Sequence, residues 1–488
     1  EKLKNNRFDL DAILLRAESA EQLNLFGQAI SDYERYLTTS TDIEAKSRVE
    51  DKLNAVRQKQ TEIVDVEPTS YERLNKLIDE YLQALVKGDS KRAQNRLETA
   101  KAIATLMLED TGERVGVDSV EYYSKVSFAN AQELLKAREL REEVSKVVAI
   151  DKFQESIDKL EKAKRIFTEQ NAIADVQTTV FLLAKFLPRV NRVSDAEKEV
   201  GTWLTVAEER GYLFDKAKLL YQQSQINFYQ GAEQVAVDKS LESLEICEKL
   251  GVEKFTLYPR LLAAQVYGSL DESDLAFAAG TEGLRISLKY KNSAFMSQFL
   301  QICGYVSAQM NLLNLSEIYL RQTVRICETE GFHGYTAVSR SILGSLLAEK
   351  GEFEEAKKLL QKAKMEDVPK TSDLIARKQQ LLRINGFEGK VYGLNKEFDK
   401  AEIAYKEAIK LIKDIGYEKV FNFYRYKHSL GEALYEQRKK PEALKELLEA
   451  KSLYRRARER ARTQNKNKIL DVNFSKRDIN ETIRLVQR

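Results

Sequence analysis

The stretch that decides the fold is Gly351-Glu-Phe-Glu-Glu-Ala-Lys-Lys-Leu-Leu-Gln-Lys-Ala363. Ala356, Leu360 and Ala363 are spaced by four and three residues, so they lie on one face of a helix. Gly344 stands twelve residues before Ala356. Two antiparallel helices cross closely only where small side chains let the backbones approach, despite the ~1 kcal/mol that a helical glycine costs. The segment therefore predicts a helical hairpin that crosses at Gly344 and Ala356.

The same offsets recur in four consecutive units. In each unit a glycine is followed by a small residue twelve positions later, a large residue after four more, and a small residue after three more. The sets are Gly304, Ser316, Leu320 and Thr323; Gly344, Ala356, Leu360 and Ala363; Gly389, Ala401, Tyr405 and Ala408; and Gly431, Ala443, Leu447 and Ala450. This periodicity predicts an array of similar helical hairpins over residues 297–450.

The second-helix pattern continues towards the N-terminus with more drift. It is found at Ala29, Tyr33 and Tyr36; Ala93, Leu97 and Ala100; Ser156, Leu160 and Ala163; Ala196, Val200 and Trp203; Ser240, Leu244 and Cys247; and Ala276, Gly280 and Gly283. The units lie 36 to 45 residues apart from Ser156 onward, but 64 and then 63 residues apart before it. Each long interval therefore predicts one or two additional helices. A joint is expected near Pro68, followed by a capping box at Thr69 to Glu72.

These residues resemble the tetratricopeptide repeat (TPR), most clearly from Ser297 to Ala450. The resemblance implies an all-α, right-handed solenoid of about ten helical hairpins with a concave binding face. The order of the N-terminal third is also similar to the TPR arm of bacterial proteins in which a TPR array precedes a CHAT domain, a caspase-like protease. That second resemblance implies a sensing or scaffolding arm that serves a separate effector domain or subunit.

Four segments are expected along the chain. They are a TPR-like helical segment at 1–66, a divergent hairpin segment with extra helices at 67–130, the TPR superhelix at 131–450, and a basic capping helix or tail at 451–488. Only five prolines occur, about 1% of the chain against a typical ~5%, which favours long helices throughout.

Composition and charge exclude several classes of function. Lysine and arginine number 79 against 76 acidic residues, so neither nucleic acid nor an acidic membrane is expected as an obligatory partner. No apolar run reaches the ~18–20 residues of a membrane span. Cys247, Cys303 and Cys327 are expected in the core, which favours a reducing, cytoplasmic setting. Because the sequence opens at Glu1 rather than at methionine, a removed signal or anchor is an alternative interpretation.

No catalytic, metal or cofactor site is predicted. The two histidines are His333, expected in a loop between repeats, and His428, about a hundred residues later on a first helix. A histidine triad or a zinc site needs several partners that converge on one point. Glycine-rich phosphate loops are absent from the sequence. The sequence therefore predicts a protein that is not an enzyme.

The concave face of the predicted superhelix is the candidate binding site. Two Gln-Gln-Tyr triplets recur at equal offsets on first helices, and four basic residues occupy corresponding positions further along. They are Gln222, Gln225 and Tyr229; Gln298, Gln301 and Tyr305; and Arg383, Lys390, Arg425 and His428. Glutamine amides can bond to a peptide backbone for ~0.5–1.5 kcal/mol each. The basic residues suit an acidic segment. The alternative is that they are ordinary helix-face and core-edge residues.

Residues 451–488 carry twelve lysines and arginines against four acidic residues. A terminal capping helix explains this charge, since solenoids need a polar outer face at their ends. Contact with an acidic protein or with nucleic acid is the alternative. The predicted function is a protein-interaction scaffold or regulatory arm that binds a peptide or partner helix in the groove. A signal-responsive, nucleic-acid-associated regulator that uses the basic C-terminal tail is the second hypothesis.

Overall fold

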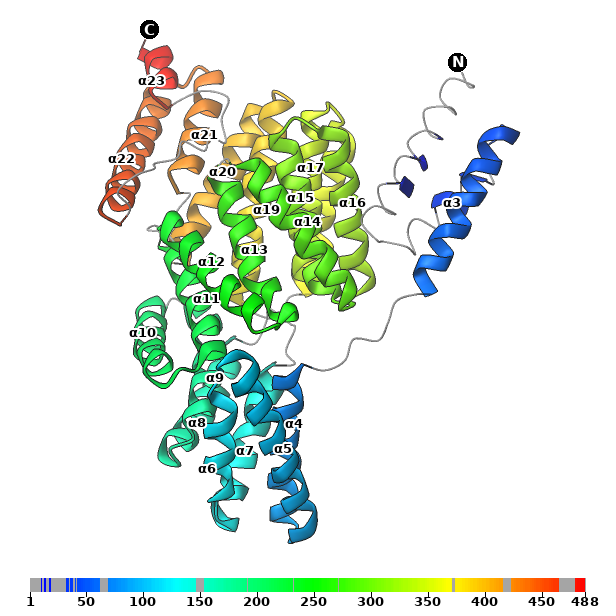
Figure 1. The fold of residues 1–488 in the computed structure, drawn as a ribbon. Coiled ribbons are helices and arrows are strands. Elements are labelled where there is room, and N and C mark those ends of the chain that lie inside the picture. Colours follow the sequence, from blue (N-terminus) through cyan, green and yellow to red (C-terminus); the bar gives the residue numbers. More distant parts are fainter. Residues whose placement is uncertain are drawn as a thin grey trace.

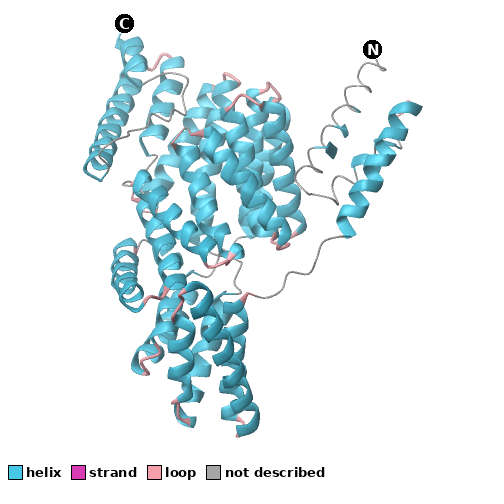
Figure 2. Cartoon of the chain, viewed as in Figure 1, coloured by secondary structure: helices cyan, strands magenta, loops and turns pink. Residues whose placement is uncertain are grey.

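The computed structural model describes residues 10, 13–14, 17–18, 32–34, 36–37, 40, 42–61, 69–145, 153–190, 192–230, 232–270, 272–370, 374–415, 423–464 and 479–487. Within these ranges all regular structure is helical, and no strand occurs (Figure 2). The predicted all-α solenoid is confirmed. Figure 1 shows α4–α9 at one end of the array, α13–α20 in the middle and α21–α23 at the other end.

The α-helices are numbered in chain order. They are α3 (Ile43–Thr61), α4 (Ser70–Val86), α5 (Ser90–Thr111), α6 (Val115–Ser124), α7 (Phe128–Ser145), α8 (Phe153–Glu169), α9 (Ile173–Phe186), α10 (Val193–Arg210), α11 (Leu213–Tyr229), α12 (Glu233–Lys249), α13 (Glu253–Ser269), α14 (Ser273–Lys289), α15 (Ser293–Gln309), α16 (Leu313–Thr329), α17 (His333–Glu349), α18 (Phe353–Lys362), α19 (Leu374–Leu394), α20 (Phe398–Asp414), α21 (Phe423–Glu436), α22 (Lys440–Gln464) and α23 (Ile479–Gln487). A 3₁₀-helix, η1 (Leu187–Val190), follows α9.

The predicted helix crossings are confirmed in register. A Cβ atom added to Gly304 would lie 2.8 Å from Leu320 Cγ and 3.3 Å from the carbonyl oxygen of Ser316. One added to Gly431 would lie 2.6 Å from Leu447 Cγ. Real Cβ atoms do not approach neighbours this closely, so the first and second helices of these hairpins meet at residues without a side chain. Gly344 and Gly389 make the equivalent approaches to the α18 and α20 sides of their hairpins.

The N-terminal units differ from the regular hairpins. Thr69 caps α4, and its side chain and that of Glu72 complete the predicted capping box. Helices α6 and α7 fill the long interval that predicted extra helices. One apolar core runs from Tyr71 to Val252 and crosses the division expected near residue 130. The hairpin expected around Ala29 and the joint at Pro68 lie mostly outside the described residues.

The C-terminal end is covered by a short helix. Helix α22 runs through residue 451 without a break, so the expected basic tail begins inside this helix. Helix α23 buries Ile479, Ile483 and Val486 in the core formed by α20, α21 and α22. The last hairpin therefore has an apolar face that α23 shields from water.

Replacing Ala356 by phenylalanine tests the crossing. Ala356 has no exposed surface, and a Cβ atom at Gly344 would already lie 3.1 Å from its carbonyl oxygen. We expect Ala356→Phe to lower the free energy of unfolding by ~1–3 kcal/mol, measured by urea denaturation. Ala278→Phe, at an exposed position of α14, is the matched control and should lower the free energy of unfolding much less. Equal stability of the two variants would contradict the assigned crossing.

Candidate functional site

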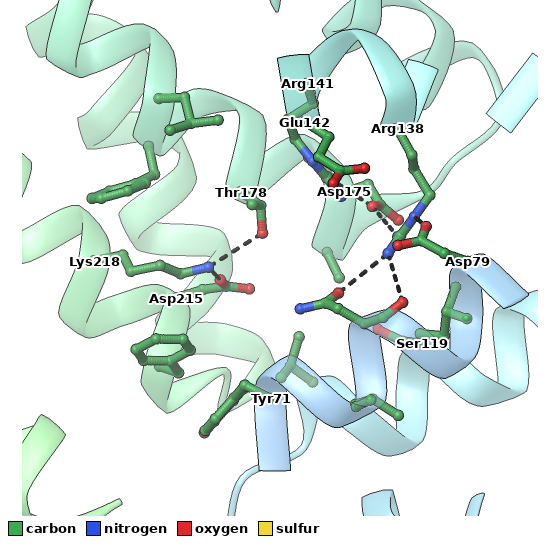
Figure 3. A pocket seen from close by; sticks show the side chains of 18 of the residues that line it. Tyr71, Asp79, Ser119, Arg138, Arg141, Glu142, Asp175, Thr178, Asp215 and Lys218 are labelled. Atoms are coloured by element: carbon green, nitrogen blue, oxygen red, sulfur yellow. Dashed lines mark hydrogen bonds and ion pairs between the residues drawn. The ribbon is translucent and has the colours of Figure 1, made fainter. Parts of the chain in front are cut away.

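A pocket of about 350 Å³ lies where α4, α6 and α7 meet the first helices α9, α11 and α13 (Figure 3). Its apolar and aromatic side chains include Tyr71, Leu74, Phe181, Leu182, Phe214 and Phe255. Its charged side chains are Asp79, Arg138, Arg141, Glu142, Asp175, Asp215 and Lys218. Figure 3 places Lys218 and Asp215 on one side of the pocket and Arg138 and Asp79 on the opposite side.

One wall is a buried network centred on Arg138 and Asp175. Arg138 is 5% exposed, and its Nη1 lies 2.6 Å from Asp175 Oδ1 while its Nε lies 2.5 Å from Asp79 Oδ1. Arg141 Nη1 lies 2.8 Å from the same Asp175 oxygen, and the Tyr123 hydroxyl donates to Oδ2. Burial alone would raise the pKa of Asp175, but the charges of Arg138 and Arg141 outweigh it and lower the pKa below its usual value. The network ties α4, α7 and α9 together.

The opposite wall carries a buried ion pair within α11. The Lys218 ammonium pairs with Asp215, three residues earlier, and donates to the Thr178 hydroxyl of α9 at 3.2 Å. The same ammonium lies 4.9 Å from the centroid of the Phe214 ring. Both charged side chains are less than a tenth exposed. Buried charges persist only when they are paired in this way.

Glu113, which does not itself line the pocket, holds two of the aromatic residues that do. This fully buried carboxylate accepts hydrogen bonds from the Tyr71 hydroxyl at 3.0 Å, from the Val115 amide at 2.8 Å and from the Phe214 amide at 2.7 Å. The two amides lie at the N-termini of α6 and α11, where a negative charge is favourable. Burial nevertheless raises the pKa of Glu113 above its usual value. Glu113 thus fixes Tyr71 and Phe214 although the latter is a hundred residues away.

Aromatic rings lead from the pocket along the first helices. Ring centroids are 4.3 Å apart for Tyr71 and Phe214, 5.1 Å for Phe214 and Phe255, 5.0 Å for Phe255 and Tyr258, and 4.8 Å for Tyr258 and Phe295. The row crosses α4, α11, α13 and α15. It connects the pocket to the helix that carries the second predicted glutamine triplet.

The first predicted triplet lies on α11 beside the pocket. Lys218, Gln222 and Gln225 are spaced by four and three residues and therefore share a face of the helix. Gln222 is fully buried, and within the described residues neither of its amide atoms has a hydrogen-bond partner. Gln225 is half-buried and donates to the Tyr221 hydroxyl at 2.7 Å. The side chain of Tyr229 lies outside the described part of the structure.

The second predicted triplet lies on α15. Gln298 is half-buried and donates to the carbonyl oxygen of Ala294 in its own helix, at 3.1 Å. Gln301 is half-buried as well, and Tyr305 is 39% exposed. These three residues are accessible, and their role in binding remains a prediction.

The basic residues expected further along do not form one open surface. Arg383 is exposed, whereas Lys390 pairs with Glu349 at 2.5 Å. Arg425 is 7% exposed, with its guanidinium 5.7 Å from the Tyr424 ring centroid. His428 is 3% exposed, and its Nε2 lies 3.1 Å from the Thr482 hydroxyl. Because α23 covers this part of α21, His428 faces the protein rather than an open groove.

The sequence also predicts positions for the three cysteines and for His333. All three cysteines are buried, and burial raises the pKa of Cys247 and Cys303 to about 12 and that of Cys327 to about 11. Their predicted role as core residues is confirmed. His333, expected in a loop, is instead the first residue of α17.

Two further features of the described residues concern metal binding and membrane crossing. There, no group of His, Cys, Asp and Glu side chains is placed to hold a metal ion. None of the described helices has the length and apolarity that crossing a bilayer requires. Of the basic C-terminal run, Arg455 and Arg456 are exposed on α22, and 465–478 lies outside the described residues.

Comparison with known proteins identifies the fold. Neither a protein-family model nor a curated protein matches the sequence. Among solved structures, a Rap protein complexed with Competence and Sporulation Factor is similar, with a TM-score of 0.53 and 10% identity, over 80% of this chain and 100% of that chain. The fold is a tetratricopeptide-like helical repeat. At this identity the likeness concerns the fold alone.

Two other solved structures are similar at lower scores. Aspartyl phosphate phosphatase F from Bacillus subtilis matches with a TM-score of 0.47 and 13% identity, over 84% of this chain and 99% of that chain. A signal-transduction ATPase with a tetratricopeptide repeat sensor from Pyrococcus horikoshii matches with a TM-score of 0.47 and 12% identity, over 90% of this chain and 64% of that chain.

The ion network makes a prediction about pH. The pKa of Asp175 is lower in the folded than in the unfolded chain, so its contribution to stability is present above about pH 4 and is lost as pH falls through the folded-state value. We expect Asp175→Asn to lower the free energy of unfolding by ~3–5 kcal/mol at pH 7, because Arg141 loses the Asp175 carboxylate and Arg138 keeps only Asp79. The difference in free energy of unfolding between this variant and the unmodified chain should be smaller at pH 3, because the Asp175 carboxylate has begun to be protonated there.

Urea denaturation at both pH values measures this effect. Asp158→Asn, at an exposed position of α8, is the control and should change stability little at either pH. A cost for Asp175→Asn that is the same at pH 3 and pH 7 would show that the carboxylate charge is not what stabilises the wall.

Proposed function

We propose that this chain is a regulatory protein-interaction module that binds a peptide or a partner helix along its first helices. The pocket between α4, α7, α9, α11 and α13 serves as the anchoring point. The observation that carries this proposal is that Lys218 of α11 lines the pocket, and that the half-buried Gln225 lies two helical turns further along the same face of α11. A ligand that enters the pocket is thereby led to the residues that the repeat pattern singled out.

The size and lining of the pocket support a binding role. A volume of about 350 Å³ falls in the range of ~300–1,000 Å³ that is usual for ligand pockets. Tyr71, Phe181, Phe214 and Phe255 supply rigid apolar surface, the kind that receives the anchor side chain of a partner. Within the first triplet, the half-buried amide of Gln225 is the group that a peptide backbone can reach for hydrogen bonding.

The ionisable groups favour binding over catalysis. A general base needs a pKa near the working pH. The pKa of Asp175 is lowered instead, and its oxygens accept from Arg138, Arg141 and Tyr123. Lys218 is likewise engaged by Asp215 and Thr178. These groups hold the walls in place and are not free to transfer protons, so we propose that the chain itself is not an enzyme.

The comparison with solved structures supports the same proposal. The similar Rap protein is complexed with Competence and Sporulation Factor, so a protein of this fold holds a bound partner. We propose that this chain acts in the same general way, as the arm that receives a signal. A separate effector domain or subunit, as implied by the weaker resemblance to TPR–CHAT proteins, remains a prediction.

Filling the pocket tests the proposal. Ala174 lines the pocket on α9, and Ala174→Phe would occupy part of its volume. Peptides selected from a random synthetic library with the unmodified chain should bind the Ala174→Phe variant at least tenfold more weakly, measured by fluorescence polarisation. Ala102→Phe, at an exposed position of α5, is the control and should bind normally. Failure to select any peptide, or full affinity of the filled variant, would refute the proposal.

A second pair of substitutions tests how far the ligand extends. Gln301→Ala combined with Tyr305→Ala removes an amide and an aromatic ring from the accessible part of α15. We expect severalfold weaker binding of the same peptides, with helicity by circular dichroism unchanged. Gln132→Ala, at an exposed position of α7, is the control. Unchanged affinity would limit the site to the pocket and to α11.

A further inference from the structure

An unpaired positive charge stands beside the pocket. Lys185 lies on α9 four residues after Phe181 and three after Leu182, and both of these line the pocket. This spacing places Lys185 one helical turn further along the same face. Its side chain is exposed, and among the described residues its ammonium has no carboxylate partner, only the Phe186 ring with its centroid at 5.4 Å.

The protein around Lys185 makes this charge costly. Desolvation by neighbouring protein atoms, and then the positive charge of Arg189, lower the pKa of Lys185 below its usual value. The opposite charge of a carboxylate brought next to the ammonium would offset both effects by electrostatic attraction. The free protein therefore presents an ammonium whose surroundings favour an acidic partner.

The pocket itself differs from Lys185, because its arginines and its lysine already pair with carboxylates of the pocket wall. Arg138 and Arg141 pair with Asp175, and Lys218 pairs with Asp215. A charged ligand group placed inside would have to compete with these buried pairs or leave one of them broken. The walls therefore favour an uncharged group, and the rings of Phe181, Phe214 and Phe255 favour an aromatic or large aliphatic one.

We infer that the bound peptide carries an aromatic or large aliphatic side chain that fills the pocket, and an aspartate or glutamate within two residues of it that pairs with Lys185. This inference rests on the proposed function, since it names the chemistry of the ligand at the same site. The spacing follows from geometry. One helical turn is ~5.4 Å, and residues i and i+2 of an extended peptide are ~6.8 Å apart.

The test uses synthetic nonapeptides with amidated C-termini, so that only side chains supply carboxylates. A random array is probed with the full chain and with two charge-reversal variants, Lys185→Glu and Lys198→Glu. Lys198 is exposed on α10 of the same hairpin, so its reversal is the matched control. Peptides bound by the unmodified chain should share the apolar residue and the nearby acidic residue. Lys185→Glu should lower the affinity for these peptides at least tenfold, and it should favour peptides in which lysine replaces the acidic residue. Lys198→Glu should change neither the affinity nor this preference.

The outcomes separate this inference from the proposed function. If the unmodified chain binds no peptide, both are overturned. If peptides bind, and Ala174→Phe blocks them, but their affinity is indifferent to the acidic residue or to Lys185→Glu, then only the acidic partner is overturned. Lys185→Gln, which removes the charge without reversing it, should weaken binding without creating a preference for lysine. Circular dichroism of each variant confirms that a loss of binding is not a loss of fold.

Discussion

The whole array depends on close backbone contact at residues with little or no side chain. At Gly304 and Gly431 a single methyl group would overlap the leucine of the facing helix, so each hairpin has one register at which it closes. The large residue one turn later, Leu320 or Leu447, then fills the space beside the crossing and is fully buried. Because each hairpin packs mainly on its neighbours, repeating this contact fixes the direction of the next pair of helices and aligns the first helices side by side.

The pocket forms where that regularity is interrupted. Helix α6 is inserted between α5 and α7, and the 3₁₀-helix η1 follows α9. Regular first helices leave a shallow surface, whereas here the helices of the N-terminal units stand opposite α9 and α11. The charges needed to hold them there are buried and must be paired. Glu113 and the Arg138–Asp175 network meet that need with hydrogen bonds that join distant parts of the sequence.

These facts explain what the sequence could and could not predict. The crossings were predictable because every offset lies within one hairpin. The pocket was not, because Arg138 and Asp175 lie 37 residues apart and Glu113 and Phe214 lie 101 apart. Each is an ordinary helical residue until the fold brings it together with its partner. The available signals were the 63-residue interval and charged residues such as Asp175 within an apolar helix. The burial of His428 could not be predicted for a similar reason, since the helix that covers it begins about fifty residues later in the sequence.

The division of charge between pocket and rim suggests how such a site discriminates. Pairs that are satisfied within the protein, such as Lys218 with Asp215, contribute order to the walls but offer a ligand no net charge. A charge without a carboxylate partner among the described residues, such as Lys185, is disfavoured in the free protein and is stabilised when a ligand supplies the counter-ion. In the proposed binding mode, specificity for charge would reside at Lys185, where water still screens it, and the apolar surface of the pocket would supply most of the affinity. A repeat array can change its ligand by altering one rim residue without disturbing the network that holds the helices.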